Sequence, residues 1–258
     1  MENKDFALAQ QKEHQRLWEE WGLLPWEVPA GSVADSPGNA VHTGVLKNEA
    51  PKSEKRGEAF EALRLQALSC GRCRLAQGRT QVVFGEGPKS PLMFVGEAPG
   101  QDEDRSGQPF VGRAGQLLTK MIEAMGTRRS LVYVANVVKC RPPENRTPLP
   151  DEVESCAHYL EQQIEWVQPE IIIALGATAT GALLRKSVPL SRVRGNFYAL
   201  PLRFPGDQRK IQVRPTFHPA YLLRNPDAKR YAWEDLQAVR DHLKVRPGST
   251  GFALFHSS

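Results

Sequence analysis

Short runs of apolar residues, each ending at polar or turn-forming residues, recur along the chain after its first third. Ile171–Leu175 is apolar without interruption, which is typical of a strand buried on both faces of a sheet. Leu92–Val95 and Leu131–Val138 contain similar runs and are also expected to be strands. Tyr198–Leu202 and Ile211–Phe217 flank a polar turn, and this arrangement predicts an antiparallel pair.

Between the strands, apolar residues recur with the period of a helix. The pattern predicts helices over residues 57–68, 113–126, 151–167 and 229–243, and a further helix that starts at Gly176. Asp151 is the expected N-cap of the third helix, because its carboxylate can accept from backbone N–H groups. Helices that alternate with buried strands predict an α/β fold, a three-layer α/β/α sandwich around a mainly parallel central sheet.

Residues 1–55 are expected to be an extension of this body. Asp5–Trp21 has helical composition, and a Pro-, Gly- and Ser-rich linker follows to about Lys55. The tryptophans of the extension either dock on the body or form a partner-binding peptide, and both interpretations stay open. The body is expected to span residues 56–245, with a C-terminal tail over residues 246–258.

Composition and charge narrow the class of protein. The chain has 258 residues, of which 40% are hydrophobic, enough for a substantial core. It has no apolar run near the roughly 20 residues of a membrane span, and its first residues are too polar for a signal peptide. We therefore expect a cytoplasmic protein without a membrane partner, and a monomer. Residues 1–50 contain four Lys or Arg against eight Asp or Glu, which leaves a net charge of +9 on residues 51–258. A basic body suits a phosphate-bearing partner.

The segment after Leu92–Val95 has the composition of a binding loop. It opens with Gly96, Pro99 and Gly100, which mark a turn, and it carries four carboxylates between Glu97 and Asp104. A strand, a long loop and a helix in this order place a ligand at the carboxyl end of a strand in open parallel sheets. The alternative is a solvated acidic loop without a ligand.

The four cysteines are spaced as two pairs, Cys70 with Cys73 and Cys140 with Cys156. Cytoplasmic proteins rarely use such a set for disulfides, so metal binding is the leading hypothesis. Zinc and an iron–sulfur cluster both accept four thiolates, and the spacing does not decide between them. The remaining alternative is four unrelated buried thiols.

With these residues in view, the chain from Glu58 to Leu243 resembles the family 4 uracil-DNA glycosylases, the iron–sulfur branch of that superfamily. The resemblance depends on four signatures that occur in the same order: the Cys70/Cys73 pair, the loop Gly96–Gly100 with Glu103 and Phe110, the segment Asn136–Arg146 with Cys156, and the motif His218-Pro219-Ala220. It implies a uracil-DNA glycosylase-like fold and an enzyme of base excision repair. Such an enzyme flips uracil out of DNA and hydrolyses its N-glycosidic bond, leaving an abasic site.

The resemblance also implies a cofactor and a substrate. The four cysteines would hold a [4Fe–4S] cluster that ties DNA-facing loops together, with zinc as the less favoured occupant. The partner would be uracil-containing DNA, single- or double-stranded.

Individual residues gain roles from the same resemblance. His218 would donate to uracil O2 as the base leaves, although a histidine before proline is often only a structural residue. Asn136 would read the O4 and N3 positions of uracil, and Phe110 would stack on the flipped base. Without the motifs, these two would pass for a strand-end amide and a core aromatic residue. The backbone of Gly96, Ala98 and Gly100 and the side chain of Glu97 would line the pocket.

Ala98 departs from the wider superfamily, in which several branches place Asp or Asn at this position to handle water. The resemblance therefore transfers water placement to Glu103 and Asn145, and makes Glu103 the candidate for excluding the methyl group of thymine.

Alternatives to a uracil glycosylase remain at this stage. They are a non-catalytic nucleic-acid-binding protein that uses an iron–sulfur or zinc site, a redox iron–sulfur carrier, and a glycosylase that prefers another deaminated base.

Overall fold

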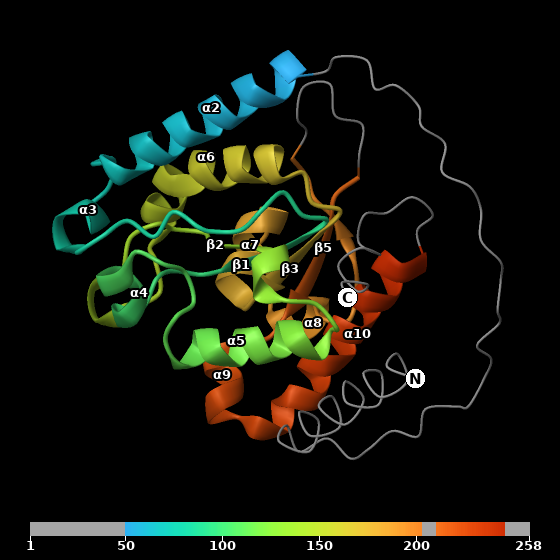
Figure 1. Ribbon diagram of the computed structural model, residues 1–258. Coiled ribbons are helices and arrows are strands. Elements are labelled where there is room, and N and C mark those ends of the chain that lie inside the picture. The colour runs from blue at the N-terminus through green and yellow to red at the C-terminus, as the bar shows by residue number, and fades with distance from the viewer. Residues whose placement is uncertain (1–49, 203–209, 246–258) are drawn as a thin grey trace, which may run out of the picture. The chain divides into compact units, whose positions relative to one another are not determined.

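The computed structural model describes residues 50–202 and 210–245, which carry all of the structural statements below (Figure 1). The chain divides into two compact units, Met1–Glu61 and Ala62–Ser258. The helix predicted over Asp5–Trp21 and the tail predicted over residues 246–258 lie outside the described residues, and the predicted domain boundaries stay predictions.

The second unit is built on a five-stranded sheet, and its strand order is β2-β1-β3-β5-β4. The strands are β1 (Leu92–Gly96), β2 (Tyr133–Asn136), β3 (Ile171–Leu175), β4 (Tyr198–Ala199) and β5 (Gln212–Thr216). All neighbouring pairs are parallel except β4 and β5. The mainly parallel sheet and its antiparallel last pair are therefore confirmed.

The register of the strands brings distant residues to one edge of the sheet. Gly96 pairs with Asn136 at the ends of β1 and β2, and Leu175 pairs with Thr216 at the ends of β3 and β5. Because parallel strands share a direction, the segments that follow these residues meet at the carboxyl edge, where open α/β sheets bind ligands.

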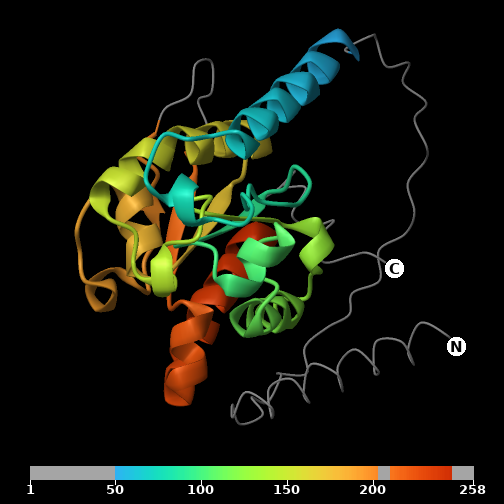
Figure 2. The same cartoon turned by 90° about the vertical axis from the view of Figure 1, so that its left-hand side faces the viewer.

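Helices lie on both faces of the sheet, with α6 on one side and α5 and α10 on the other (Figures 1 and 2). The longer helices are α2 (Ala50–Leu68), α5 (Arg113–Ala124), α6 (Pro150–Val167), α7 (Ala177–Leu184) and α10 (Lys229–Val245). The shorter ones are α3 (Leu75–Gly78), α4 (Gln101–Ser106), α8 (Leu190–Val193), α9 (Pro219–Arg224), η1 (Arg129–Leu131), η2 (Pro143–Asn145) and η3 (Pro226–Ala228). The α/β/α layering is confirmed. Within the described residues, no helix is long and apolar enough to cross a membrane.

The segment after β1 is not the continuous loop that the sequence predicts, because it contains α4. This helix starts after Gly100, whose N–H donates to the carboxylate of Glu103 at 3.1 Å. It ends at Gly107, which adopts the left-handed conformation (φ 73°) that glycine allows. The polar sequence of α4 has no apolar stripe, so the periodicity could not have shown it.

The predicted N-cap of α6 was wrong. The helix starts at Pro150, which lacks an N–H and suits the first helical position, and its N-cap is Leu149. Glu152 accepts from the Leu149 N–H at 2.8 Å, whereas the Asp151 carboxylate pairs with Arg74 at 2.6 Å. The carboxylate that caps α6 is therefore that of Glu152, which lies within the first turn of the helix and not before it.

Other boundaries also differ from the expected ones. The helix predicted to begin near residue 57 begins at Ala50, inside the predicted linker. The helix expected to end at Gly126 ends at Ala124, and the strand expected over 131–138 is limited to Tyr133–Asn136. Propensity and periodicity mark the existence of an element more firmly than its ends.

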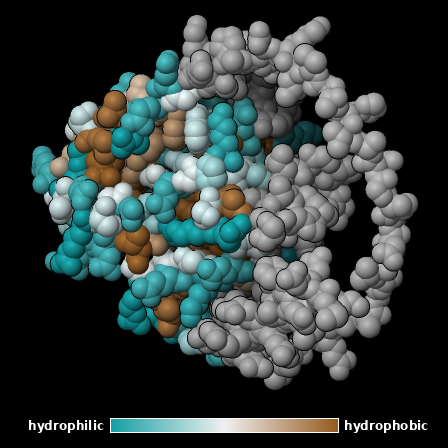
Figure 3. Space-filling model, in the orientation of Figure 1, coloured by the Kyte–Doolittle hydropathy of each residue, from teal (hydrophilic) through white to brown (hydrophobic). Residues whose placement is uncertain are grey.

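The core lies between the sheet and its helices. All residues of β1, β2 and β3 are buried, as their apolar runs predict. The described part of the surface in Figure 3 is mostly hydrophilic, with brown patches scattered among polar residues. The exposed large apolar residues include Tyr221 and Leu223, both on α9.

Candidate active site

A cavity of about 490 Å³ opens at the carboxyl edge of the sheet. The segments that follow β1, β2 and β5 line it, together with the start of α5. Of the predicted site residues, it brings together Glu97, Ala98, Gly100, Glu103, Phe110, Asn136, Asn145 and His218. Gly96 does not line the cavity. It lies directly beneath two residues that do.

Asn136 ends β2 and is almost completely buried, with 1% of its surface exposed. Its Oδ1 has no hydrogen-bond partner among the described residues. A Cβ atom on Gly96 would collide with this Oδ1 and with the ring of Phe110. Gly96 is therefore required because both side chains approach its backbone closely. A buried amide oxygen that lacks a protein partner is costly, and in a cavity it indicates a ligand that supplies the donor.

Phe110 adopts a left-handed backbone conformation, with φ 54°, which is uncommon for a residue other than glycine. Its side chain is buried, and its ring centroid lies 5.8 Å from that of His218. A Cβ atom on Gly115 of α5 would overlap the Phe110 carbonyl, so a second glycine permits this turn. Strained residues of this kind concentrate at binding sites, where the surroundings hold them in place.

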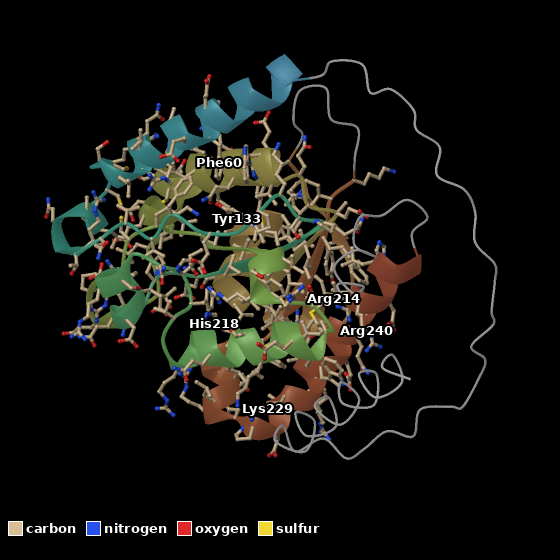
Figure 4. All side chains as sticks on the ribbon, in the orientation of Figure 1. Phe60, Tyr133, Arg214, His218, Lys229 and Arg240 are labelled. Carbon is tan, nitrogen blue, oxygen red and sulfur yellow. The ribbon has the colours of Figure 1, made fainter. Side chains whose placement is uncertain are left out.

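His218 is the N-cap of α9 and is partly buried beside α5 (Figure 4). Its Nδ1 accepts a hydrogen bond from the Ala220 N–H at 3.1 Å. Burial, with a smaller contribution from Arg224, lowers the pKa of His218 to about 4, and Glu103 opposes this shift. The imidazole is therefore neutral near pH 7. Since Nδ1 is an acceptor, the proton lies on Nε2, which can donate to a ligand.

The carboxylate of Glu103 ties the two ends of the loop together. Its Oε1 accepts from the N–H groups of Val111 and Gly112, both at 2.9 Å, and its Oε2 accepts from Gly100. Glu103 also lines the cavity, and Oε2 has capacity for one more hydrogen bond. The family resemblance implied that Glu103 places water. The structure adds a structural role, because this carboxylate fixes the turn that contains Phe110.

The segment between β2 and α6 forms another wall of the cavity. Glu144 and Asn145 both have φ of 56°, and Asn145 Oδ1 accepts from Arg141 Nε at 2.8 Å. Arg146 pairs with the buried Glu152 through two hydrogen bonds, at 2.7 and 2.8 Å, and holds the pKa of Glu152 below its usual range. The asparagine amide therefore lies on a strained but anchored segment.

The lining residues that were not among the predicted site residues include Arg146, Thr147, Tyr221 and Arg224. Tyr221 and Arg224 follow His218 on α9, and a helix that starts at Pro219 would have placed them near the histidine. No comparable signal exists for Thr147.

The four cysteines line a second, smaller cavity together with Arg72, Arg79 and Lys139. None of them forms a disulfide. Arg79 Nη1 donates to Cys140 Sγ at 3.2 Å. Burial raises the pKa of Cys140, and it raises the pKa of Cys156 to about 11. In the described ranges, no group of three or more His, Cys, Asp or Glu side chains is arranged to hold a metal ion.

Lys139 connects the cysteine cavity to the larger one. It is 2% exposed, and its Nζ donates to the Asn136 carbonyl at 2.7 Å and to Gln163 Oε1 at 2.6 Å. Burial lowers the pKa of Lys139 to about 8, while Cys156 and Cys140 oppose that shift. No carboxylate of the described residues forms an ion pair with it.

Comparison with known proteins gives consistent matches. Residues 84–237 match the family model of the uracil DNA glycosylase superfamily. A type-4 uracil-DNA glycosylase of Thermotoga maritima is 46% identical over 193 residues, which cover 73% of this chain and 97% of that protein. The type-4 enzymes of Sulfurisphaera tokodaii and Saccharolobus solfataricus are 43% and 44% identical, over 74% and 70% of this chain and 87% and 85% of theirs.

Proposed function

Because the chain belongs to the uracil-DNA glycosylase superfamily, and within it to the type-4 enzymes, we infer that it removes uracil from DNA by hydrolysing the N-glycosidic bond. One observation carries this proposal: a single cavity of about 490 Å³ holds an unpaired buried amide, a strained aromatic residue and a neutral histidine donor. Enzymes that act on a base in DNA take it out of the stack into such a pocket.

Asn136 is proposed to select uracil. Its unpaired Oδ1 can accept the proton on uracil N3, and its amide nitrogen can donate to O4. Cytosine has no proton on N3 and carries an amino group at position 4, so both contacts would fail. A buried polar group left unpaired by the wrong base penalises that base strongly.

His218 is proposed to stabilise the departing uracil anion. The Ala220 N–H occupies Nδ1, which leaves the Nε2 proton for uracil O2. Bond cleavage gives the sugar oxocarbenium character and moves negative charge onto the base, so a fixed donor at O2 helps most in the transition state. Phe110, 5.8 Å from His218 between ring centroids, is proposed to stack on the base and hold O2 in place.

Water placement is proposed for Glu103 and Asn145. Among the described residues, Oε2 of Glu103 accepts a single backbone hydrogen bond, from Gly100, and it keeps a lone pair for water. Asn145 uses its Oδ1 for Arg141, which leaves its amide N–H groups as donors. Attack by water at the sugar carbon would complete hydrolysis and leave an abasic site. The exclusion of thymine is also proposed to involve Glu103, because this carboxylate lies beside Gly100 in the pocket wall.

The second cavity is proposed to hold a [4Fe–4S] cluster. Its four free cysteines would hold the cluster, because four thiolates are the donor set that such a cluster requires. The buried Lys139 ammonium without a carboxylate partner and the Arg79 guanidinium on Cys140 favour an anionic occupant. The cluster would supply a structural link between the segments that bear the cysteines. Zinc is the less favoured occupant.

We further propose that the enzyme acts as a cytoplasmic monomer on single- or double-stranded DNA. Free thiols suit a reducing compartment.

Arg224 lines the pocket and forms no hydrogen bond or ion pair with any described residue, so it is available to a phosphate of DNA. Affinity for DNA should fall steeply as salt increases, with and without uracil in the strand. A salt-independent affinity would contradict phosphate binding.

The activity is tested with an end-labelled oligonucleotide that contains one uracil, incubated with the protein and then treated with alkali, which cuts abasic sites. Cleavage at the uracil alone, with intact thymine and cytosine controls, is the expected result. Strands with hypoxanthine or xanthine, and duplexes with adenine or guanine opposite uracil, define the substrate range. DNA binding without cleavage would favour the non-catalytic alternative.

The cofactor is tested by metal analysis of anaerobically purified protein. We expect a brown protein with about four iron and about four sulfide per chain. Cys140→Ser should lower both contents and reduce stability, because the free energy of metal binding is also free energy of folding. Ser155→Ala, in the wall of the same cavity, is the matched control and should keep the cluster. About one zinc and no iron would overturn the assignment.

A further inference from the structure

The turn that contains Phe110 is held at both of its ends. On one side, Glu103 accepts from the N–H groups of Val111 and Gly112. On the other side, Arg129 Nη2 donates to the Pro109 carbonyl. The residue between these anchors has the strained φ of 54°. Such a conformation persists only when its surroundings fix it, so these anchors decide where the ring lies.

Arg129 comes from a distant part of the sequence and is itself oriented by an acid. It lies in η1, beyond α5, and donates from Nε and Nη2 to Glu86 Oε1 at 3.2 and 2.8 Å. Glu86 forms a β-bridge with Val134 through two backbone hydrogen bonds, at 3.0 and 2.8 Å. Glu86 therefore fixes the position of the Arg129 guanidinium relative to β2, the strand that ends in Asn136.

The placement of Arg129 is poorly explained by stability alone. Its Nη1 is buried and has no hydrogen-bond partner in the part of the chain that the structure describes. The Glu86 side chain is 40% exposed, which limits the strength of the ion pair. A guanidinium in an ion pair of limited strength that holds the carbonyl next to a strained residue has the features of a positioning group.

We propose that Arg129 is a positioning residue for base stacking, oriented by Glu86. It fixes the Pro109 carbonyl, and the fixed carbonyl keeps Phe110 in its left-handed conformation above Gly96. Neither Arg129 nor Glu86 lines the cavity, so both act through Phe110 and not on the base. The proposal rests on the proposed glycosylase activity. It adds that the position of the Phe110 ring against the base depends on the Arg129–Glu86 ion pair, which lies outside the cavity.

A double-mutant cycle tests this dependence. Single-turnover excision from a single-stranded uracil oligonucleotide is measured for wild type, Arg129→Met, Phe110→Ala and the double variant. Arg129→Met should lower the rate by roughly tenfold, the scale expected when a reacting group is slightly misplaced. In the Phe110→Ala background the same change should alter the rate by less than about twofold, because coupled residues are not additive. Equal effects in both backgrounds would overturn the proposal.

Three further measurements distinguish a positioning role of Arg129 from an effect of its substitution on folding or on charge. Affinity for an abasic strand should stay within about twofold of wild type, since the flipped base is absent from it. Arg129→Lys, which keeps one donor, should recover part of the rate, and Glu86→Gln should show a smaller loss that also disappears with Phe110→Ala. No recovery by lysine together with a lowered melting temperature would assign Arg129 to stability only.

Arg185→Met is the matched control, because Arg185 pairs with Glu161 at 2.8 Å and neither residue lines the cavity. Its excision rate should equal that of wild type. If wild type itself does not excise uracil, the proposed function fails. If wild type is active and Arg129→Met is equally active, only the present inference fails.

Discussion

Strand β5 leads to two buried polar clusters of opposite character. Within the strand, Arg214 donates to Asp235 Oδ1 and to the Gly195 carbonyl, both at 2.9 Å, and Arg194 Nε lies 3.4 Å from the other oxygen of Asp235. Just beyond the strand, His218 lines a cavity with Asn136, whose Oδ1 has no partner among the described residues. Figure 4 labels Arg214, which lies within β5, and His218, which follows the strand.

The difference lies in what the polar groups face. Around Asp235 opposite charges face one another, so the cluster serves the folded chain. Around Asn136 and His218 they face a cavity, so their partner must be a ligand.

Backbone strain follows the same division. The described residues include five non-glycine positions in the left-handed region: Phe110, Glu144, Asn145, Gln168 and Arg185. Gln168 and Arg185 are ordinary helix C-caps, whereas the other three belong to the turns around the pocket. The left-handed residues that are not helix C-caps therefore also lie at the proposed ligand site.

The largest effect that tests this comparison is expected at Asp235. Asp235→Ala leaves Arg214, which is 5% exposed, without its anion, and it removes one of the two carboxylates that pair with Arg194. It should lower the free energy of unfolding by about 4 kcal/mol. The excision rate of the folded fraction should remain close to that of wild type. Urea unfolding and single-turnover kinetics measure the two quantities separately.

Asp241→Ala on the same helix is the matched control. Its carboxylate is 61% exposed and pairs with Arg240 at 3.0 Å, so the loss should stay below about 1 kcal/mol. Should Asp235→Ala fail to accumulate, Asp235→Asn keeps the shape and is measured instead. A large fall in excision rate at unchanged stability would show that the charged cluster takes part in catalysis.

His218→Ala should show the reverse pattern. Loss of the Nε2–H donor should lower the single-turnover rate by roughly 10²-fold or more, the scale found when one oxyanion donor is removed. Loss of the N-cap of α9 should lower the free energy of unfolding by only about 1 kcal/mol, and affinity for abasic product should change little. His242→Ala, which removes an imidazole packed on Phe197, controls for the loss of a ring elsewhere. A rate near that of wild type for His218→Ala would reject the anion-stabilising role.

Asn136→Asp sharpens the comparison by keeping the shape of the amide and changing its hydrogen bonding. The carboxylate loses the donor to uracil O4 and presents an acceptor to the amino group of cytosine. Uracil excision should fall by roughly 30-fold, and trace cytosine excision should appear. Rates on matched uracil and cytosine strands measure both changes. Equal losses on both bases would mean that Asn136 supports the pocket and does not read the base.

Sequence patterns predicted the parts of this molecule that depend on local chemistry. The bounds of β3 follow from the uninterrupted apolar run Ile171–Leu175, because a doubly buried strand needs such residues. The family resemblance implied that Phe110, Asn136 and His218 share one site, and the cavity brings them together. Asn136 and His218 meet there because the parallel strands β2 and β5 end at the same edge of the sheet.

Features that depend on tertiary contacts could not be predicted in this way. No periodicity links Arg129 to Pro109 or Arg214 to Asp235, since each pair meets only after the sheet and its helices pack. The left-handed φ of Phe110 also has no local signal, because the glycines that permit it, Gly96 and Gly115, are separated from it along the chain.

The smallest expected effect is that of acid on folding, and it comes from the histidine that faces the cavity. In the folded protein, burial and Arg224 lower the pKa of His218 to about 4, against the opposing charge of Glu103. In the unfolded chain a histidine titrates near a pKa of roughly 6.5. Between these values the unfolded chain binds the proton more readily, so stability is fully present above about pH 6.5 and is lost as the pH falls toward about 4.

Two urea unfolding series, for wild type and His218→Gln at about pH 7.5 and about pH 5, isolate this contribution, because all other titrating groups are shared. Wild type should lose about 2 kcal/mol more than the variant over this interval, as expected for a pKa depressed from roughly 6.5 to about 4. The excision rate of wild type should stay level over the same interval, since the neutral imidazole remains the main form. An equal loss of stability in both proteins would show that His218 titrates normally and is not held neutral by its place beside the cavity.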